Sequence, residues 1–316
     1  MVYEMLMMLV GLGVLIIGSN LLLKGATDIA LRARVSPLVV GATVVAFGTS
    51  SPELLISIQA ALMGSSDFTM GNVIGSNICN LALIFGLTSV IRPMKINSDS
   101  IKVDWPVAMS ATLLLYFLLL KGTIGYMEGT LFLVLLLAYT LFIIDKSRKE
   151  KLKNVEKHYP VEKEITFKGN LWLGIMFLII GSLGLYFGSE WFVTGAKNMA
   201  WIFGISERVI GIMVLAVGTS LPEMVTSLVA AFKKETDLAI GNLIGSNIFN
   251  ILFILGITGL ITDVKASGTI LNVDMIWMLG VTLIILPMMA FNKKMGRTSG
   301  FLLLTIYVFY TYIVIG

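Results

Sequence analysis

The 316-residue chain is poor in cysteine, histidine and charge, and each shortage excludes a class of protein. Cys79 and His158 are the sole residues of their kinds. With one of each, the chain cannot build a disulfide framework, a Cys/His zinc site or a serine–histidine–acid triad. Charged residues make up 13% of the chain, against about 25% in soluble domains, whereas hydrophobic residues make up 57%. This composition excludes a water-soluble globular protein and indicates an integral membrane protein.

Long apolar runs recur along the whole chain. A helix needs about 20 apolar residues to cross the hydrocarbon core. Ten runs approach that length: 3–23, 37–62, 69–91, 104–120, 126–145, 170–194, 208–232, 238–262, 272–291 and 298–315. Such runs are too long and continuous for barrel strands, so the sequence predicts an all-α polytopic membrane protein with ten transmembrane helices. The first run lacks a basic start and a small-residue cleavage site, which indicates a retained span rather than a signal peptide.

Basic residues are distributed unevenly between the predicted loops. Loops after odd-numbered spans hold 19 of the 23 Lys and Arg residues, and loops after even-numbered spans hold four. Because cytoplasmic loops carry the excess of Lys and Arg, the chain is predicted to lie in the cell membrane with both termini extracellular. The polar loop 146–169 is then cytoplasmic. The pI of 9.0 is therefore a signal of topology, and no nucleic-acid partner is expected.

Part of the sequence is duplicated. Residues 16–88 repeat at 186–258 with a constant offset of 170 and no gap; 22 of the 40 positions in the two best-matching blocks are identical. Five predicted spans separate equivalent points, and five is odd, so the second copy must be inverted in the membrane. The sequence predicts two inverted five-helix repeats, 1–145 and 170–316, joined by a cytoplasmic linker at 146–169. This arrangement is typical of secondary transporters, whose site lies between the repeats at mid-membrane.

Spans 2 and 7 contain matching motifs, GTSSPE at 48–53 and GTSLPE at 218–223. Proline removes a backbone donor and clashes with the carbonyl four residues earlier, so both helices are predicted to kink or break just before the proline. A break frees carbonyl groups of the preceding turn, which are costly in lipid unless something binds them. Broken helices 2 and 7 therefore predict a polar site deep in the bilayer.

Each of these motifs ends in a carboxylate, Glu53 or Glu223, within an otherwise uncharged stretch. An acidic residue at the bilayer centre costs on the order of 3 kcal/mol. For one such residue, a protonated side chain hydrogen-bonded within the bundle is the simpler explanation. Two acids in duplicate positions, beside two predicted helix breaks, favour a binding site.

Spans 3 and 8 carry a second pair of motifs, GNxxGSNxxN, which places polar side chains at every fourth residue and so on one helix face. They are Asn72, Ser76 and Asn80 in the first copy, and Asn242, Ser246 and Asn250 in the second. The glycines of the motif also permit close helix packing. All candidate ligands are oxygen atoms, which favours hard cations over Zn²⁺ or Cu²⁺, and a flexible oxygen cage suits Ca²⁺ better than Mg²⁺. The ions are expected as substrates, and no cofactor is predicted.

At these residues the sequence resembles the sodium/calcium exchanger family of the cation/calcium exchanger superfamily. GTSxPE followed by GNxxGSNxxN, twice at one offset, carries the resemblance, which covers nearly the whole chain. It implies that Glu53 and Glu223 are the central ligands of Ca²⁺ and of Na⁺. It also implies that spans 1 and 6 slide across a fixed core. The further ligands that it implies are Ala46, Thr49, Ser50, Ser76, Asn80, Ala216, Thr219, Ser220, Ser246 and Asn250, with Ala46, Ala216 and the two Thr contributing backbone oxygens.

The predicted function is a secondary antiporter, not an enzyme, that exchanges Na⁺ for Ca²⁺ by alternating access and is electrogenic if more than two Na⁺ replace one Ca²⁺. Its partners are these ions and membrane lipid, with no obligatory protein partner. Exchange of H⁺, or of K⁺ with Na⁺, against Ca²⁺ is the alternative on the same scaffold. The proton-coupled branch has a GNxxE-type motif where this chain has GTSxPE, and the potassium-dependent branch has Asp where this chain has Asn250. A cation channel and a membrane enzyme are rival classes that the inverted repeat and the lack of a nucleophile–base pair disfavour.

Overall fold

The computed structural model describes residues 1–157, 171–204 and 216–315. The first half contains α1 (Val2–Ala33), α2 (Pro37–Val40), η1 (Gly41–Val45), α3 (Ala46–Leu62), α4 (Ser66–Ile78), η2 (Cys79–Ile84), α5 (Phe85–Ile91), β1 (Met94–Lys95), η3 (Ser100–Asp104), α6 (Trp105–Leu119), β2 (Thr123–Ile124) and α7 (Tyr126–Lys157). The second half contains α8 (Leu171–Ile202), α10 (Ala216–Thr219), α11 (Leu221–Phe232), α12 (Thr236–Phe249), η5 (Asn250–Ile254), α13 (Leu255–Ile261), β3 (Val264–Lys265), η6 (Ile270–Asp274), α14 (Met275–Ala290), η7 (Phe291–Lys293), β4 (Lys294–Met295) and α15 (Arg297–Ile315).

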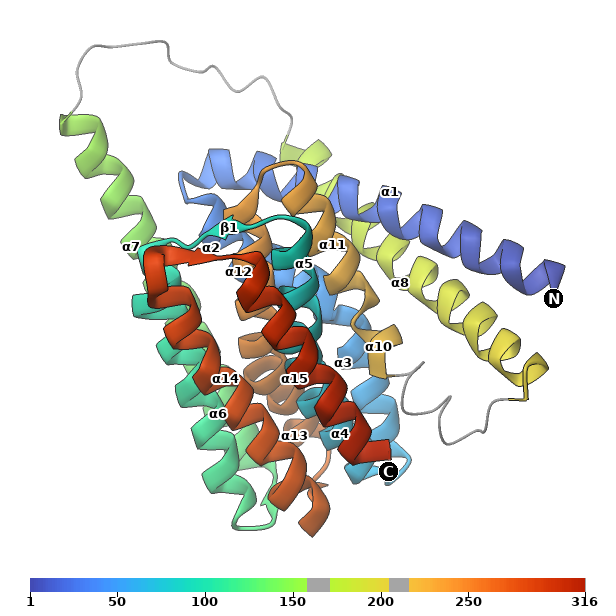
Figure 1. The fold of residues 1–316 in the computed structure, drawn as a ribbon. Helices are drawn as coiled ribbons and strands as arrows, with labels where there is room; N and C mark the ends of the chain where they lie inside the picture. The colour runs from blue at the N-terminus through green and yellow to red at the C-terminus, as the bar shows by residue number, and fades with distance from the viewer. Residues whose placement is uncertain (158–170, 205–215, 316) are drawn as a thin grey trace.

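Membrane-spanning helices dominate the structure, as predicted (Figure 1). Nine helices within the described ranges are long and apolar enough to cross a bilayer, and they correspond to predicted spans 1–6 and 8–10. The predicted seventh span, 208–232, is represented by α10 and by the shorter apolar helix α11. The rest of that span, to residue 215, lies outside the described residues. The all-α membrane architecture is confirmed, and ten spans are consistent with it.

Two helices run well past the apolar residues that predicted them. α1 and α8 each extend for 32 residues. Both are longer than the bilayer core requires, so each can span it while tilted. α7 likewise continues beyond residue 145 to Lys157. Ion pairs one turn apart support this extension, with Nζ–O distances of 2.6 Å for Lys149–Asp145 and 3.7 Å for Lys146–Glu150. The predicted linker therefore begins as helix, and its residues 158–169 lie outside the described residues.

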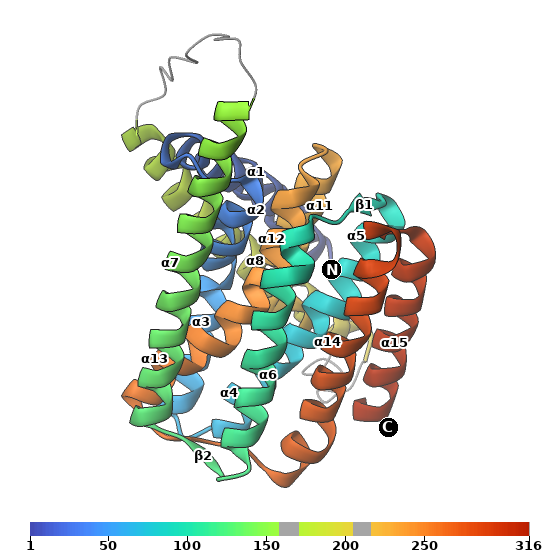
Figure 2. The same cartoon turned by 90° about the vertical axis from the view of Figure 1, so that its left-hand side faces the viewer.

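Two short strand pairs show which loops lie at the same end of the helix bundle (Figure 2). β1, after predicted span 3, pairs antiparallel with β4, after predicted span 9. At the other end β2, after predicted span 4, pairs antiparallel with β3, after predicted span 8. Because β1 and β4 share one end, an even number of crossings must separate them. Spans 4 to 9 lie between β1 and β4, which makes six crossings if the seventh span is counted and five if it is not. The pairing therefore agrees with a total of ten spans.

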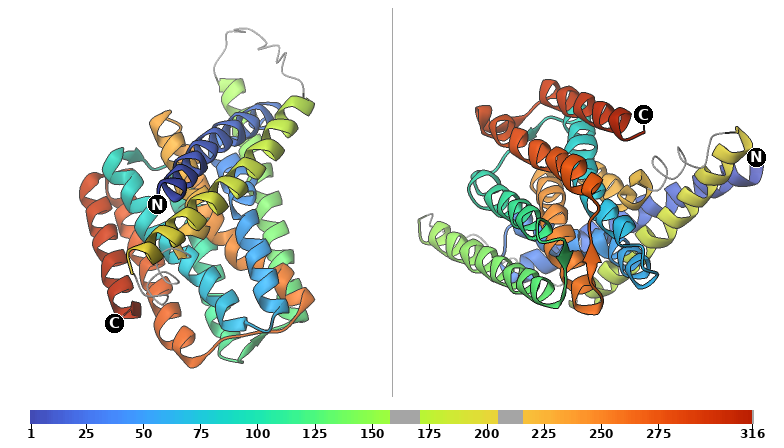
Figure 3. Two further views of the ribbon diagram at one scale, coloured as in Figure 1. Left: turned by 90° about the vertical axis from the view of Figure 1, so that its right-hand side faces the viewer. Right: turned by 90° about the horizontal axis from the view of Figure 1, so that it is seen from below.

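α1 and α8 lie side by side and antiparallel, projecting obliquely from the remaining helices (Figure 3). Glycines at intervals of seven residues line the contact on both helices: Gly11, Gly18 and Gly25 on α1, and Gly174, Gly181, Gly188 and Gly195 on α8. A Cβ added at Gly181 would lie 2.5 Å from the backbone nitrogen of Leu22, and one at Gly18 would lie 2.9 Å from the carbonyl oxygen of Gly181. Glycine is therefore required at Gly18 and Gly181 for the two backbones to approach so closely.

Segments of π-helix recur at equivalent places in the two repeats. η2 is matched by η5, and η3 is matched by η6 at an offset of 170 residues. The structural duplication therefore extends beyond the segment 16–88 that sequence identity marks, into the start of the fourth and ninth spans. Short π-helical segments within α-helices are frequent at functional sites.

Candidate cation-binding site

The predicted ligands lie on four helical segments that meet inside the bundle. α3 carries the first GTSxPE motif, and α10 with α11 carries the second. The polar stripes lie on α4 with η2 and on α12 with η5, and α12 contacts both α3 and α11. Both Glu53 and Glu223 have a solvent exposure of 0%. Ala46, Thr49, Ser50, Ser76, Asn80, Ser220, Ser246 and Asn250 are buried as well. The structure thus brings these residues together in the interior, whereas the side chain of Ala216 lies outside the described part.

The two prolines affect their helices differently. In the second copy the chain leaves the helix at Ser220, between α10 and α11, and Pro222 lies in the first turn of α11. This is the predicted break. In the first copy the helix is not interrupted at Pro52, because α3 continues through it, so of the predicted kink or break the break is absent there. The irregularity lies earlier, in η1, where the backbone nitrogen of Ala46 donates to the carbonyl of Gly41.

Side chains of one repeat bond to those of the other at the centre of the bundle. The Ser50 hydroxyl donates to Oε1 of Glu223 across 3.0 Å, and the Thr49 hydroxyl donates to Oδ1 of Asn242 across 3.1 Å. The same Thr49 oxygen is 3.3 Å from the carbonyl oxygen of Ala46 and 3.4 Å from Oγ of Ser246. Residues far apart in sequence therefore form one polar cluster that both repeats build.

Several buried oxygens of this cluster lack hydrogen bonds within the described part of the chain. They are both carboxylate oxygens of Glu53, Oε2 of Glu223, Oγ of Ser76 and the side-chain oxygens of Asn80 and Asn250. Buried polar atoms are nearly always satisfied, so unsatisfied acceptors on equivalent residues mark a place where a cation, a water molecule or a proton shared by the carboxyls would be held. Oxygen atoms with two carboxylates among them fit Ca²⁺ or Na⁺.

Among the described residues, no three His, Cys, Asp or Glu side chains are grouped to hold a metal ion, so Glu53 and Glu223 are not joined by a third acid. A cation between the repeats would therefore take its charge balance from Glu53 and Glu223 and its other ligands from neutral oxygens. Of the predicted ligands, Thr219 is the last residue of α10, next to the break at Ser220. It is half-buried and makes an interaction of its own.

Two equivalent polar contacts support the site, and neither was predicted from the sequence. The amide of Asn72 donates to Oγ of Ser57 across 3.0 Å, and the amide of Asn242 donates to Oγ of Ser227 across 3.0 Å. Both bonds join a stripe helix to its neighbouring GTSxPE helix. The signal was present in the sequence, since the stripes included both asparagines and the two serines match at the offset of 170.

A second symmetric feature escaped the sequence analysis. Buried Asp104, at the end of η3, accepts a hydrogen bond of 2.9 Å from the Tyr139 hydroxyl, and Asp274, at the end of η6, accepts one of 3.0 Å from Tyr310. The two aspartates are 170 residues apart. Their tyrosine partners lie on the fifth and tenth spans but differ from this offset by one residue, which is why a search for identical spacing misses the pair.

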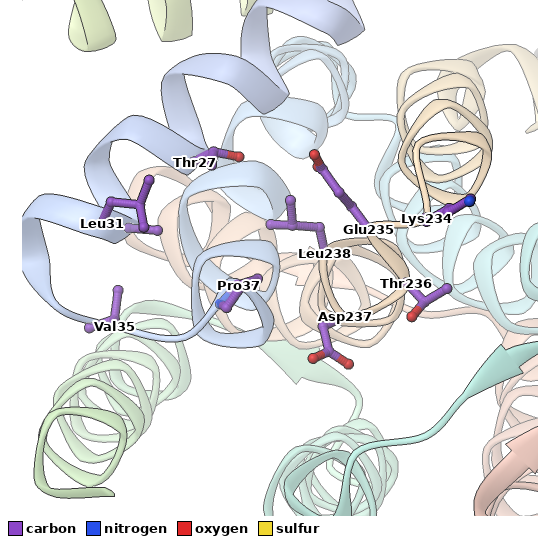
Figure 4. A pocket seen from close by; sticks show the side chains of 10 residues that line it. Thr27, Leu31, Val35, Pro37, Lys234, Glu235, Thr236, Asp237 and Leu238 are labelled. Atoms are coloured by element: carbon purple, nitrogen blue, oxygen red, sulfur yellow. The ribbon is translucent and has the colours of Figure 1, made fainter. Parts of the chain in front are cut away.

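A cavity of about 440 Å³ lies away from the predicted ligands, at the end of the bundle that holds β1 and β4 (Figure 4). It is lined by α1, by the connection to α2, and by the turn from α11 into α12. Figure 4 shows Thr27 and Glu235 turned toward the same space. None of the predicted ligands lines it, but Leu238 at its wall is one helical turn from Asn242 along α12.

Comparison with known proteins places this arrangement in a family. Residues 3–144 and 173–316 match the family described as "Sodium/calcium exchanger protein". The chain belongs to the sodium/calcium exchanger family. The resemblance found in the sequence motifs is thereby confirmed. The family and fold are those of a membrane transporter and not of an enzyme.

Relatives of similar length support this membership. The sodium/calcium exchanger MaX1 of Methanosarcina acetivorans is 31% identical over 96% of each chain. The membrane protein MJ0091 of Methanocaldococcus jannaschii is 35% identical over 95% of this chain and 94% of its own. A solved structure of the sodium-calcium exchanger NCX_Mj, soaked with zero Na⁺ and Ca²⁺, superposes with a TM-score of 0.83 at 32% identity, covering 98% of both chains. The fold of this exchanger-family chain is therefore that of NCX_Mj.

Proposed function

We propose that the chain is a Na⁺/Ca²⁺ antiporter that works by alternating access and uses the inward Na⁺ gradient to expel Ca²⁺. The observation that carries the proposal is the cluster of buried, unsatisfied oxygens around Glu53 and Glu223, shared between the inverted repeats. Two carboxylates balance one Ca²⁺ or two Na⁺, so occupation by one ion disfavours the other. Exchange is electrogenic if more than two Na⁺ replace one Ca²⁺.

The proposed ligands are the twelve residues that the family resemblance implies, including the Asn80 and Asn250 amides and the backbone oxygens at positions 46 and 216. The two repeats, 1–145 and 170–316, form the halves of the carrier, and 146–169 joins them. α1 and α8 slide together as one unit, a motion supported by their glycine-lined contact and by their projection from the other helices (Figure 3).

The proposed orientation places the end with β1 and β4 in the cytoplasm and both termini outside. The excess of Lys and Arg in the loops at that end supports this orientation. The cavity beside Thr27 and Glu235 then opens toward the cytoplasm, one helical turn from Asn242. The substrates are Ca²⁺ and Na⁺, and the surrounding partner is lipid.

Reconstitution tests the coupling ion. Proteoliposomes loaded with Na⁺ are diluted into Na⁺-free buffer and uptake of ⁴⁵Ca²⁺ is followed, with an added K⁺ arm and a pH-gradient arm. Uptake that needs only the Na⁺ gradient is the expected result. Uptake that requires K⁺ would indicate K⁺-dependent Na⁺/Ca²⁺ exchange, and uptake that follows the proton gradient would indicate H⁺/Ca²⁺ exchange. Neither result would change the fold or the proposed site.

Replacing Ser50 by alanine should weaken Ca²⁺ transport through the loss of its hydrogen bond to Glu223. Hydrogen bonds to charged groups contribute about 1.5–3 kcal/mol, so the KM for Ca²⁺ is expected to rise roughly tenfold or more. Ser51→Ala is the matched control, because the exposed Ser51 hydroxyl bonds to the carbonyl of Phe47 within its own helix. Equal effects of the two substitutions on KM would contradict the role of Ser50.

Asn250→Asp should change the dependence of exchange on monovalent cations. The buried Asn250 amide has unsatisfied polar atoms within the described part of the chain, and an added carboxylate there supplies a third negative charge. We expect the variant to require a different concentration of Na⁺, or to become sensitive to K⁺, in the ⁴⁵Ca²⁺ uptake assay. Unchanged Na⁺ and K⁺ dependence would remove this position from the site.

A further inference from the structure

Two asparagines outside the proposed ligand set join the repeats. The Nδ2 of Asn77 donates to the backbone carbonyl of Asn247 across 3.4 Å, and the Nδ2 of Asn247 donates to the carbonyl of Asn77 across 3.2 Å. Because the residues are 170 apart, the contact is reciprocal between equivalent positions. It therefore lies at the pseudo-two-fold axis that relates the repeats. The two side chains are 1% and 3% exposed, so both bonds lie in the interior.

The Asn77–Asn247 pair is adjacent in sequence to the proposed ligands on both sides. Each asparagine directly follows a stripe serine and comes three residues before a stripe asparagine, Asn80 or Asn250. The helix becomes π-helical within the next three residues, at Cys79 in one copy and at Asn250 in the other. The pair thus fixes the last regular turn before the segments that carry Asn80 and Asn250.

The contact between Asn77 and Asn247 is made by the Nδ2 groups of their side chains, which act as donors. Oδ1 of Asn77 and Oδ1 of Asn247 have no hydrogen-bond partner among the residues described, whereas Nδ2 of each is engaged. The Nδ2 of Asn77 also lies 3.5 Å from Sδ of Met278 on α14. Each bond joins a side chain of one repeat to the backbone of the other, so it sets the separation of α4 and α12 rather than the conformation of either helix.

We propose that Asn77 and Asn247 are positioning residues that fix the spacing between the two polar stripes and thereby set the selectivity of the site among divalent cations by size. The proposal rests on the proposed cation site between the repeats. Selectivity among hard cations depends on cavity size, ligand number and flexibility. The reciprocal link at the axis holds the ligands from both repeats at the distance that suits Ca²⁺, and its loss loosens the cage in favour of larger ions.

The test compares Ca²⁺ with the larger Ba²⁺ in wild type, Asn77→Ala, Asn247→Ala and the double variant. Equilibrium binding of ⁴⁵Ca²⁺ to purified protein, with Ba²⁺ as competitor, is measured beside ⁴⁵Ca²⁺ uptake. The ratio of the Ba²⁺ to the Ca²⁺ dissociation constant is expected to fall at least fivefold in each single variant. Because both bonds form one link, the double variant is expected to show less than the product of the two single effects.

Thr88→Val and Thr258→Val are the matched controls. Each removes a buried hydroxyl that bonds across 2.7 Å to a carbonyl of its own helix and so leaves the contact between repeats intact. Asn77→Ser and Asn247→Ser, which keep a polar group, serve if the alanine variants do not fold. An unchanged ratio in folded variants, or failure of all asparagine variants to fold while the threonine controls fold, would overturn the selectivity role. Absence of Ca²⁺ binding in wild type would instead refute the proposed function.

Discussion

Replacing either Glu53 or Glu223 by glutamine is expected to lower the rate of Na⁺-driven Ca²⁺ uptake at least 100-fold. The two carboxylates are fully buried and supply the negative charge of the polar cluster between the repeats. Glutamine keeps the shape but removes one of the two charges that balance Ca²⁺. At Ca²⁺ concentrations below saturation, a 100-fold loss of affinity, about 2.8 kcal/mol, lowers the uptake rate in the same proportion. The measurement is ⁴⁵Ca²⁺ uptake into Na⁺-loaded proteoliposomes, normalised to the amount of folded protein.

Glu190→Gln is the matched control for both glutamate variants. Glu190 also lies on an apolar helix, α8, but its side chain is exposed. Its replacement removes a carboxylate without touching the cluster and should leave the uptake rate near that of wild type. Full activity of purified Glu53→Gln or Glu223→Gln would refute the assignment of the site.

Substitution of Gly181 by valine should separate α1 from α8 and strongly destabilise the protein. A Cβ at this position would lie 2.5 Å from the backbone nitrogen of Leu22 and 2.8 Å from the carbonyl oxygen of Gly18. Neither backbone atom can move without shifting a helix, so the cost is at least the roughly 1–3 kcal/mol typical of overpacking. We expect a lower thermal denaturation midpoint in detergent and loss of most transport activity.

Gly13→Val provides the control for the helix contact. Gly13 lies on α1 with no atom within 4 Å of an added Cβ, so valine there faces open space. The same substitution should therefore change the denaturation midpoint little. A similar loss of stability at both positions would show that helix propensity, rather than the close contact with α8, governs the effect.

Much of the fold was predictable because its signals are local and repeated. The duplication at an offset of 170, the apolar runs and the uneven distribution of basic residues define the architecture without knowledge of packing. The candidate site was predictable for the same reason, because Glu53 and Glu223 are charges in apolar surroundings. Their burial in the bundle confirms the position that this pattern predicts, while their role as ligands stays a prediction.

The details that depend on tertiary packing could not be predicted. Pro52 removes one backbone hydrogen bond, but α3 tolerates this loss while η1 provides the irregularity several residues earlier. Hydropathy marked the end of the fifth span at residue 145, although α7 continues as a polar helix supported by pairs such as Lys149–Asp145. The Asn77–Asn247 contact depends on how two helices meet, which no periodicity within one helix reveals.

The central claim is that one site, built by both repeats, takes Ca²⁺ or Na⁺ in competition. The most direct test is equilibrium binding of ⁴⁵Ca²⁺ to the purified protein over a range of Na⁺ concentrations, with Glu53→Gln and Glu223→Gln measured in parallel. The account predicts one Ca²⁺ per chain, an apparent affinity that falls steeply as Na⁺ rises, and no measurable binding in either variant. Ca²⁺ binding that is independent of Na⁺, or that persists in both variants, would contradict it.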